Sequence, residues 1–138
     1  MFDDLKDVFR NVLDLTYNVR RVDKDWSVVS VNEFFNPDIM EISKEQDALD
    51  SYFNSLDFAT IKTLQCIMYL GRDEDHDSND IPEVIYEKQQ KYFDDSIGWN
   101  TKEIEINQMT EKSPVLYDYF KNGFKILKIQ IEPVKNFV

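Results

Sequence analysis

Apolar residues recur every three or four positions along most of the chain, with polar residues between them. Residues 2–21 give the clearest pattern, because charged side chains occupy the positions outside an apolar stripe formed by Phe2, Leu5, Phe9, Val12 and Leu13. This spacing is typical of an amphipathic helix, whose apolar face packs against a core. We therefore predict a helix over 2–21.

The next segment, residues 22–42, interrupts this helical pattern. Trp26 and the valines that follow it favour a β-strand, and Asn36–Pro37 is a typical turn signal. The tail at 127–132 also alternates between apolar and polar residues. These features predict a short strand at 26–31 that pairs with 127–132, followed by an irregular connection.

Start and stop signals divide the middle of the chain into two helices. Ser43 and Gln46 match a capping box, which predicts a helix from residue 43 to about residue 56. Asp57 can cap the following helix, and Gly71 supplies the left-handed residue that commonly ends one. Because this second helix is apolar over much of its circumference, we predict that it is the central element of the fold.

A polar loop at 72–80 separates this central helix from the next one. Asp80 is a suitable N-cap, and Pro82 suits the first turn because its missing N–H is not needed there. Gly98 marks the end of this helix. Its apolar positions are Val84, Ile85, Tyr86, Tyr92 and Phe93.

Two further helix starts lie in the last third of the chain. Asn100 and Glu103 match a capping box that opens a helix at 101–112, although alternating isoleucine and glutamate within it leave a strand open. Ser113–Pro114 opens the last helix. The inward stripe of that helix consists of Leu116, Phe120, Phe124 and Leu127. Gly123 lies inside this stripe, which predicts a close approach of two helices.

These segments predict a mainly α-helical bundle of five or six helices, with the small two-stranded β element as an addition. The chain has the length of one domain, 1–138, and its hydrophobic content of 42% is sufficient for a core. No repeat or linker divides it.

The composition adds a strong negative charge. Sixteen basic and 27 acidic side chains give a formal net charge of −11. Such a field repels nucleic acids and anionic membranes and attracts basic proteins, although solubility alone also explains an acidic surface. The single cysteine excludes an intrachain disulfide, and no segment resembles a signal peptide or a membrane span. We therefore expect a cytoplasmic protein.

Acidic side chains are concentrated in the polar loop, which supplies the candidate binding site. Side-chain oxygens alternate at Asp73, Asp75, Asp77 and Asn79 as in calcium loops, but Ser78 and Val84 stand where an EF-hand needs glycine and glutamate. Weak cation binding and a merely solvated loop stay open as alternatives to a docking surface for Lys or Arg. The predicted partner-binding residues are Asp73, Glu74, Asp75, Asp77 and Asp80, with Asp94 and Asp95 as a secondary patch.

Residues for catalysis or metal binding are few. His76, the only histidine, is predicted to be an exposed loop residue, and Cys66 a buried, unreactive thiol. One histidine and one cysteine cannot build the usual tetrahedral zinc sites, and three glycines do not make a phosphate-binding loop. We predict that the protein is not an enzyme and holds no cofactor. Lys121, Lys125 and Lys128 are predicted to form a polar outer helix face.

Two stretches, Met68-Tyr-Leu-Gly-Arg-Asp73 and Ser113-Pro-Val-Leu-Tyr-Asp-Tyr-Phe-Lys-Asn-Gly123, resemble a family of uncharacterised bacterial helical domains. In that family an apolar helix ends in Gly-Arg and an acidic loop, and a later Pro-x-Leu-x-x-Tyr-x-x-x-Gly helix closes the domain. The resemblance implies a helical fold over about half the chain and carries no functional residue.

The leading functional hypothesis is an inhibitor such as an immunity protein or antitoxin. Toxins that act on nucleic acids have basic clefts, which an acidic domain can occupy. A nucleic-acid-mimicking phage inhibitor of host defence is a variant of this idea. One alternative is a small ligand-binding or enzymatic domain with an aromatic pocket around Tyr69, His76 and Trp99. Another is a scaffold or oligomerisation module.

Overall fold

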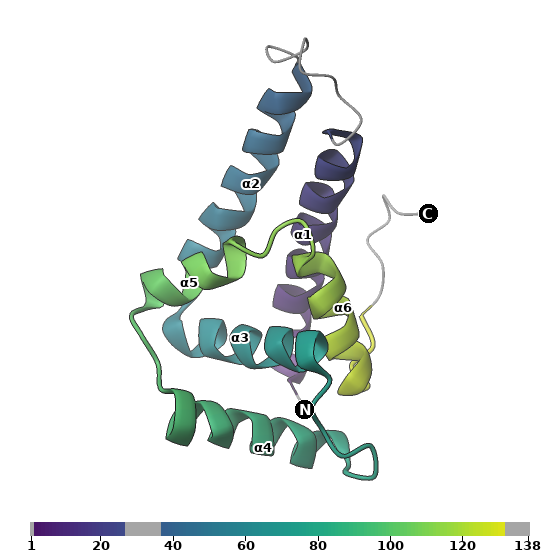
Figure 1. Cartoon of the computed structure of the whole chain (residues 1–138), viewed down its shortest axis with the longest axis vertical. Coiled ribbons are helices and arrows are strands. Elements are labelled where there is room, and N and C mark those ends of the chain that lie inside the picture. The colour runs from purple at the N-terminus through teal and green to yellow at the C-terminus, as the bar shows by residue number, and fades with distance from the viewer. Residues whose placement is uncertain (1, 27–36, 132–138) are drawn as a thin grey trace.

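A computed structural model describes residues 2–26 and 37–131, and this part of the chain contains six α-helices and no strand (Figure 1). A short 3₁₀ turn, Asp3–Leu5, precedes the first helix, and a π-helical turn, Phe93–Ile97, follows the fourth. The predicted mainly α-helical bundle is confirmed. The helices are α1 (Lys6–Trp26), α2 (Pro37–Ser55), α3 (Phe58–Asp73), α4 (Pro82–Tyr92), α5 (Lys102–Thr110) and α6 (Leu116–Ile126).

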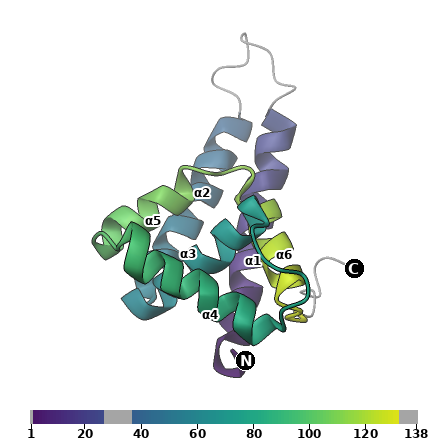
Figure 2. The same ribbon diagram turned by 60° about the horizontal axis from the view of Figure 1, so that its bottom comes forward.

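The two longest helices, α1 and α2, form an antiparallel pair, and α3 crosses near the base of that pair (Figure 1). α6 packs against both α1 and α3, and α5 packs against both α2 and α3. α4 lies on the remaining side of α3 and runs along it in the opposite direction (Figure 2). α3 therefore contacts three other helices, as its apolar circumference predicts.

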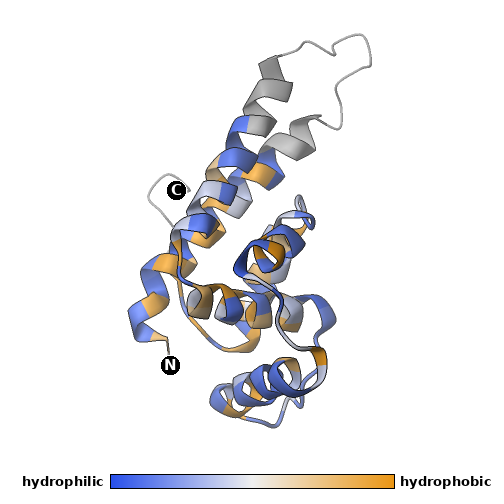
Figure 3. Ribbon diagram, turned by 90° about the vertical axis from the view of Figure 1, so that its left-hand side faces the viewer, coloured by the Kyte–Doolittle hydropathy of each residue, from blue (hydrophilic) through white to orange (hydrophobic). Residues whose placement is uncertain are grey.

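The core follows from the apolar stripes of these helices, which face one another inside the bundle (Figure 3). The stripe predicted for α6, from Leu116 to Leu127, is buried at all four positions. On α2, Leu49 and Phe53 are buried, whereas Ala48 is exposed. The buried residues of α3 include Ile61, Leu64, Cys66, Ile67, Met68 and Leu70. Among the described residues, no helix combines the length and apolar character needed to cross a bilayer.

The contact between α3 and α6 depends on two glycines. A Cβ atom added at Gly123 would collide with the backbone carbonyl of Ile67, so the predicted close helix approach is confirmed. A Cβ added at Gly71 would collide with the carbonyl of Tyr119. Gly71 is therefore a packing residue inside α3, and the prediction that it ends the helix is wrong. Glu74 ends α3 instead, with φ of 54° and its N–H donated to the carbonyl of Leu70.

The two-stranded element is the main error of the sequence-based prediction. Trp26 is the last residue of α1, and residues 127–131 form no strand, while residues 27–31 and 132 lie outside the described part. α6 ends in a Schellman motif, with Lys128 at φ 55° and the N–H of Ile129 donated to the carbonyl of Phe124. This turn redirects the chain immediately before its alternating tail.

Helix starts are shifted more often than they are missed. α2 begins at Pro37, six residues before Ser43, because proline is pre-organised for the first helical position. Asp57 caps α3 as predicted, since its Oδ1 accepts a hydrogen bond of 2.8 Å from the N–H of Thr60. This bond also lowers the pKa of Asp57.

The remaining helices begin one to three residues from their predicted starts. Ile81 rather than Asp80 precedes α4. Thr101 caps α5 by accepting a bond of 3.3 Å from the N–H of Ile104, and the segment is a helix and not a strand. Consecutive turns occupy 111–115, so α6 begins at Leu116, after the predicted Ser113–Pro114 start.

Candidate functional site

One strongly acidic stretch of the chain contains all of the predicted binding residues. We define the acidic arm as residues 72–95, which comprise the end of α3, the loop, α4 and the start of the π-helical turn. Nine acidic and three basic side chains give these 24 residues a net charge of −6, more than half of the total of −11. Eight of the nine acidic residues are exposed, and the ninth, Asp80, is half-buried.

A groove of about 530 Å³ lies between this arm and the rest of the bundle. One wall comes from the end of α3 and from α5, and the other comes from the loop, α4 and the π-helical turn. Five acidic residues line it: Asp73, Asp75, Asp77, Asp80 and Glu105. The two basic residues in its lining are Arg72 and Lys88.

The loop owes its conformation partly to its own carboxylates. Oδ1 of Asp77 accepts a hydrogen bond of 2.9 Å from the N–H of Asn79, and its carbonyl accepts one of 3.0 Å from the N–H of Asp80. The carboxylate of Glu74 accepts a bond of 2.6 Å from the side-chain amide of Asn122 on α6. These bonds hold the loop against the bundle and reduce the number of carboxylates that are free to meet a partner.

Two of the predicted binding residues are also neutralised by ion pairs. Asp73 pairs with the adjacent Arg72 at 2.8 Å, and Asp80 pairs with Lys88 at 2.7 Å. The hydrogen bond from each cation to its carboxylate raises the pKa of Arg72 and of Lys88. Asp75 lines the groove, is exposed and makes no hydrogen bond or ion pair with the described residues. It is therefore the loop carboxylate best placed for an external cation.

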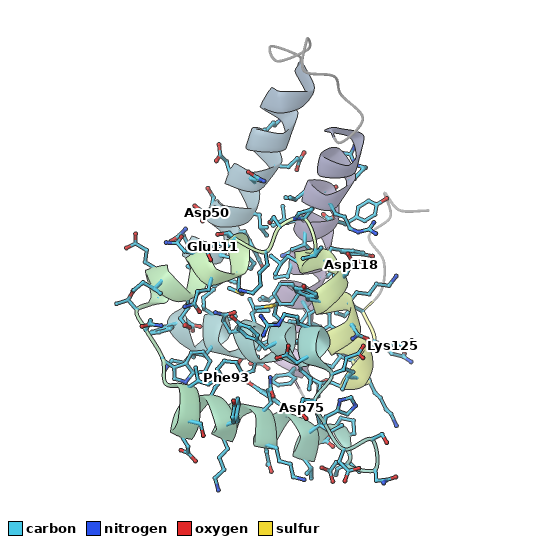
Figure 4. All side chains as sticks on the ribbon, viewed as in Figure 1. Asp50, Asp75, Phe93, Glu111, Asp118 and Lys125 are labelled. Carbon is cyan, nitrogen blue, oxygen red and sulfur yellow. The ribbon has the colours of Figure 1, made fainter. Side chains whose placement is uncertain are left out.

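The secondary patch lies at the opposite end of α4. An eleven-residue helix is about 16 Å long, so Asp94 and Asp95 are well separated from the loop. Figure 4 shows this separation through Asp75 at one end of α4 and Phe93 at the other. Asp94 accepts a hydrogen bond of 2.6 Å from the indole N–H of Trp99, whereas Asp95 is exposed. The predicted residues thus mark the two ends of the arm.

Aromatic rings connect the arm to α3 beside the groove. Phe93 stacks on Trp99 with 5.3 Å between ring centroids and lies 5.4 Å from Tyr69. The guanidinium of Arg72 lies 4.4 Å from the centre of the Tyr69 ring. At the same end of the arm, Tyr92 and Ile97 line the groove yet are 56% and 55% exposed. Such exposed apolar side chains are common in protein-binding surfaces.

The sequence analysis did not predict a buried polar cluster that lies behind the groove. Glu105 lines the groove from α5 but is only 3% exposed. The side-chain amide of Gln65 donates to the carbonyl of Glu105 at 3.2 Å, to its carboxylate at 3.5 Å and to Gln108 at 3.3 Å. The sequence contains one indication that Glu105 is buried. On a helix, Glu105 lies four residues before the buried Met109, so the two residues share one face.

The remaining candidates for chemistry are His76 and Cys66. His76 lines the groove and is half-buried, so the prediction of an exposed histidine is wrong in part; its Nδ1 is buried without a hydrogen-bond partner among the described residues. Cys66 is 1% exposed, and burial, followed by the charges of Asp94 and Glu105, raises the pKa of its thiol to about 12. The predicted burial of Cys66 is confirmed, and the raised pKa fits the unreactive thiol that the sequence predicts. Within the described ranges, no three His, Cys, Asp or Glu side chains are placed to hold a metal ion.

The two stretches that resemble bacterial helical domains meet in space. Gly71 of the first and Gly123 of the second lie on opposite sides of the contact between α3 and α6, so these motifs have a packing role here. No family model, curated protein or solved structure matches the chain, and membership of that family therefore stays a prediction.

Proposed function

We propose that the protein is a non-catalytic binding domain that docks through its acidic arm onto a basic protein partner, acting as an immunity protein or antitoxin in the cytoplasm. The observation that carries this proposal is the net charge of −6 on 24 mostly exposed residues around a groove. Electrostatic complementarity of this kind speeds encounter and selects a partner of opposite charge.

A toxin that cuts or binds nucleic acid suits this surface. Its cleft is basic because it must hold phosphates, and an acidic domain in that cleft blocks access. The same argument supports a nucleic-acid-mimicking phage inhibitor of a host defence protein, which also presents carboxylates in place of phosphates. Tyr92 and Ile97 add apolar contacts at one end of the arm, where aromatic anchors contribute much of the binding free energy in protein interfaces.

The test reverses charges at sites where the carboxylates support nothing else. Asp75→Lys with Asp95→Lys changes the arm, and neither side chain has a hydrogen bond or ion pair with the described residues. Asp47→Lys with Asp50→Lys makes the same change in net charge on exposed residues of α2, far from the arm (Figure 4). A basic partner captured from native lysate is then presented to each variant, and association is followed by surface plasmon resonance at low and high salt.

We expect the arm variant to lower the association rate constant about tenfold at low salt and the α2 variant to change it by less than about twofold. The difference arises because local charge at the docking face, and not the total charge, steers encounter. Equal slowing in both variants, or a partner whose binding is insensitive to salt, would contradict the proposal.

The groove also supports a second candidate, a domain that binds a small cationic ligand. Its volume of about 530 Å³ lies within the range of roughly 300–1,000 Å³ typical of small-molecule sites. Native mass spectrometry of protein purified from its own cells distinguishes the two functions. A bound small molecule of constant mass that the Asp75→Lys and Asp95→Lys variant lacks would favour this second candidate.

A further inference from the structure

We infer that the groove receives an arginine side chain of the partner and that its guanidinium binds at Glu105. This inference rests on the proposed function and adds the chemistry of one contact.

The lining of the groove contains more negative than positive charge. Both of its cations are already engaged, Arg72 with Asp73 and Lys88 with Asp80. Asp75, Asp77 and Glu105 form no ion pair with the described residues, although Lys88 also interacts electrostatically with Asp77. An external cation that enters the groove therefore meets three carboxylates that are not in an ion pair.

Glu105 is the unusual member of these three, because it is 97% buried. A carboxylate removed from water is costly unless a cation or several hydrogen bonds compensate it. Its carboxylate accepts one hydrogen bond from the described residues, the long bond of 3.5 Å from Gln65. Glu105 lies in the first turn of α5, where the helix dipole favours an acid, but no ion pair with the described residues neutralises its charge. A cation at this point would add that counter-charge, so we place Glu105 at the inner end of the site.

The polar groups around Glu105 are short of donors, and this favours arginine over lysine. The single amide nitrogen of Gln65 serves three acceptors, while its own oxygen has no donor among the described residues. A guanidinium brings five N–H donors in a planar fork, whereas an ammonium brings three at one point.

The rim of the groove suits the rest of an arginine side chain. Tyr92 and Ile97 are exposed at one end and offer apolar surface to its methylene groups. Asp75 offers a carboxylate at the other end, which attracts a basic segment on either side of the arginine. A groove of about 530 Å³ has room for the side chain and for part of the backbone that carries it.

The experiment titrates the full chain with small probes and follows backbone and side-chain amides by NMR. The probes are N-acetylarginine amide, N-acetyllysine amide and the neutral N-acetylcitrulline amide, which has nearly the shape of the first. We expect saturable shifts at Gln65, Glu105 and Gln108 with the arginine probe. The lysine probe should bind about tenfold more weakly and the citrulline probe should produce no saturable shift. Equal responses to all three, or shifts only elsewhere, would overturn the inference.

A matched pair of variants tests Glu105 directly. Glu105→Gln removes the charge at constant size, and Glu111→Gln makes the same change at the exposed end of α5 (Figure 4). The first should weaken arginine binding at least about tenfold and the second should leave it unchanged. Retained binding in Glu105→Gln overturns the inference. If that variant fails to fold, the chemical shifts at Gln65 and Gln108 of the unmodified protein still show whether the arginine probe binds at this site.

The same measurements separate this inference from the proposed function. If charge reversal on the arm slows partner association while Glu105→Gln changes neither partner nor arginine binding, the docking function stands and the arginine site falls. If the arginine probe binds through Glu105 while the arm variants associate normally with every basic partner, the docking function falls. In that case the groove is a site for free guanidinium compounds and not for a partner's side chain.

Discussion

α3 meets α6 on one side and α4 on another, and the two contacts are built in opposite ways. Against α6, Gly71 and Gly123 let the backbones touch, and apolar side chains fill the surrounding space. Against α4, a hydrogen bond of 3.2 Å joins Tyr86 to Thr63, another of 3.2 Å joins Gln89 to the carbonyl of Cys66, and a groove remains beside them.

The difference shows how one helix can serve both a core and a binding surface. Small residues allow close packing, in which many weak dispersion contacts add up. Carboxylates cannot be buried without compensation, so the side of α3 that faces the acidic arm keeps an open groove beside its polar contacts. Stability is therefore expected to depend mainly on the α6 side and binding mainly on the α4 side.

The largest expected effect is on the α6 side. Phe120 is a fully buried residue of α6, and Phe120→Ala should lower the free energy of unfolding by about 4 kcal/mol because it leaves a large cavity. On the arm, Tyr92→Ala should change it by less than about 0.5 kcal/mol, since Tyr92 is 56% exposed. Urea unfolding followed by circular dichroism measures both. Similar losses of stability in the two variants would show that stability does not depend mainly on the contact between α3 and α6.

The second prediction concerns the backbone contact itself. Gly71→Ala should cost about 3 kcal/mol, because the added Cβ collides with the carbonyl of Tyr119 and forces α3 and α6 apart. Gly98→Ala is the control: it has open space around it, but its φ of 80° and ψ of 170° suit glycine alone, so it should cost about 1–2 kcal/mol from backbone strain. Thermal and urea unfolding give the two values. If the control is the more damaging change, close packing at Gly71 is not what stabilises this contact.

The smallest expected effect concerns the contact between α3 and α4 outside the groove. It tests whether water is excluded from Cys66, which is buried there. Burial raises the pKa of the Cys66 thiol from 9.0 to about 12, so the unfolded chain loses this proton first as pH rises. The associated stability is fully present below pH 9 and is lost progressively towards pH 12. By about pH 10 the free energy of unfolding should have fallen by about 1.4 kcal/mol from this group.

Comparison with two variants isolates that decline. The Cys66→Ala variant should lack this decline in stability, whereas the Tyr86→Phe variant should retain it. The reason is that the ordinary pKa of Tyr86 is 10.0 and burial raises that pKa to about 12. Tyr86 therefore contributes its own decline only at higher pH. Urea unfolding at a series of pH values gives the slopes. An unchanged slope in Cys66→Ala would mean that water reaches the thiol in the folded protein.

Part of the site could be predicted because its residues are neighbours in the chain. The loop carboxylates from Asp73 to Asp80 stand together in the sequence, and their polarity excludes them from a core. The opposite wall could not be predicted in this way, since Glu105 and Gln108 come from α5 and reach the groove only after α3, α4 and α5 pack. The same holds for the ion pairs of Asp73 and Asp80, which depend on where Arg72 and Lys88 point.

The sequence by itself determined the helical class, the buried stripe of α6, the cap at Asp57 and the excess of negative charge. These depend on periodicity, local hydrogen bonding and composition, all of which act over a few residues. Only the tertiary structure decided that Gly71 is a packing residue, that α6 is followed by a turn and not a strand, and which carboxylates face the groove. Those outcomes depend on contacts between segments distant in the chain, where the space available to a side chain is set by its neighbours and not by its own type.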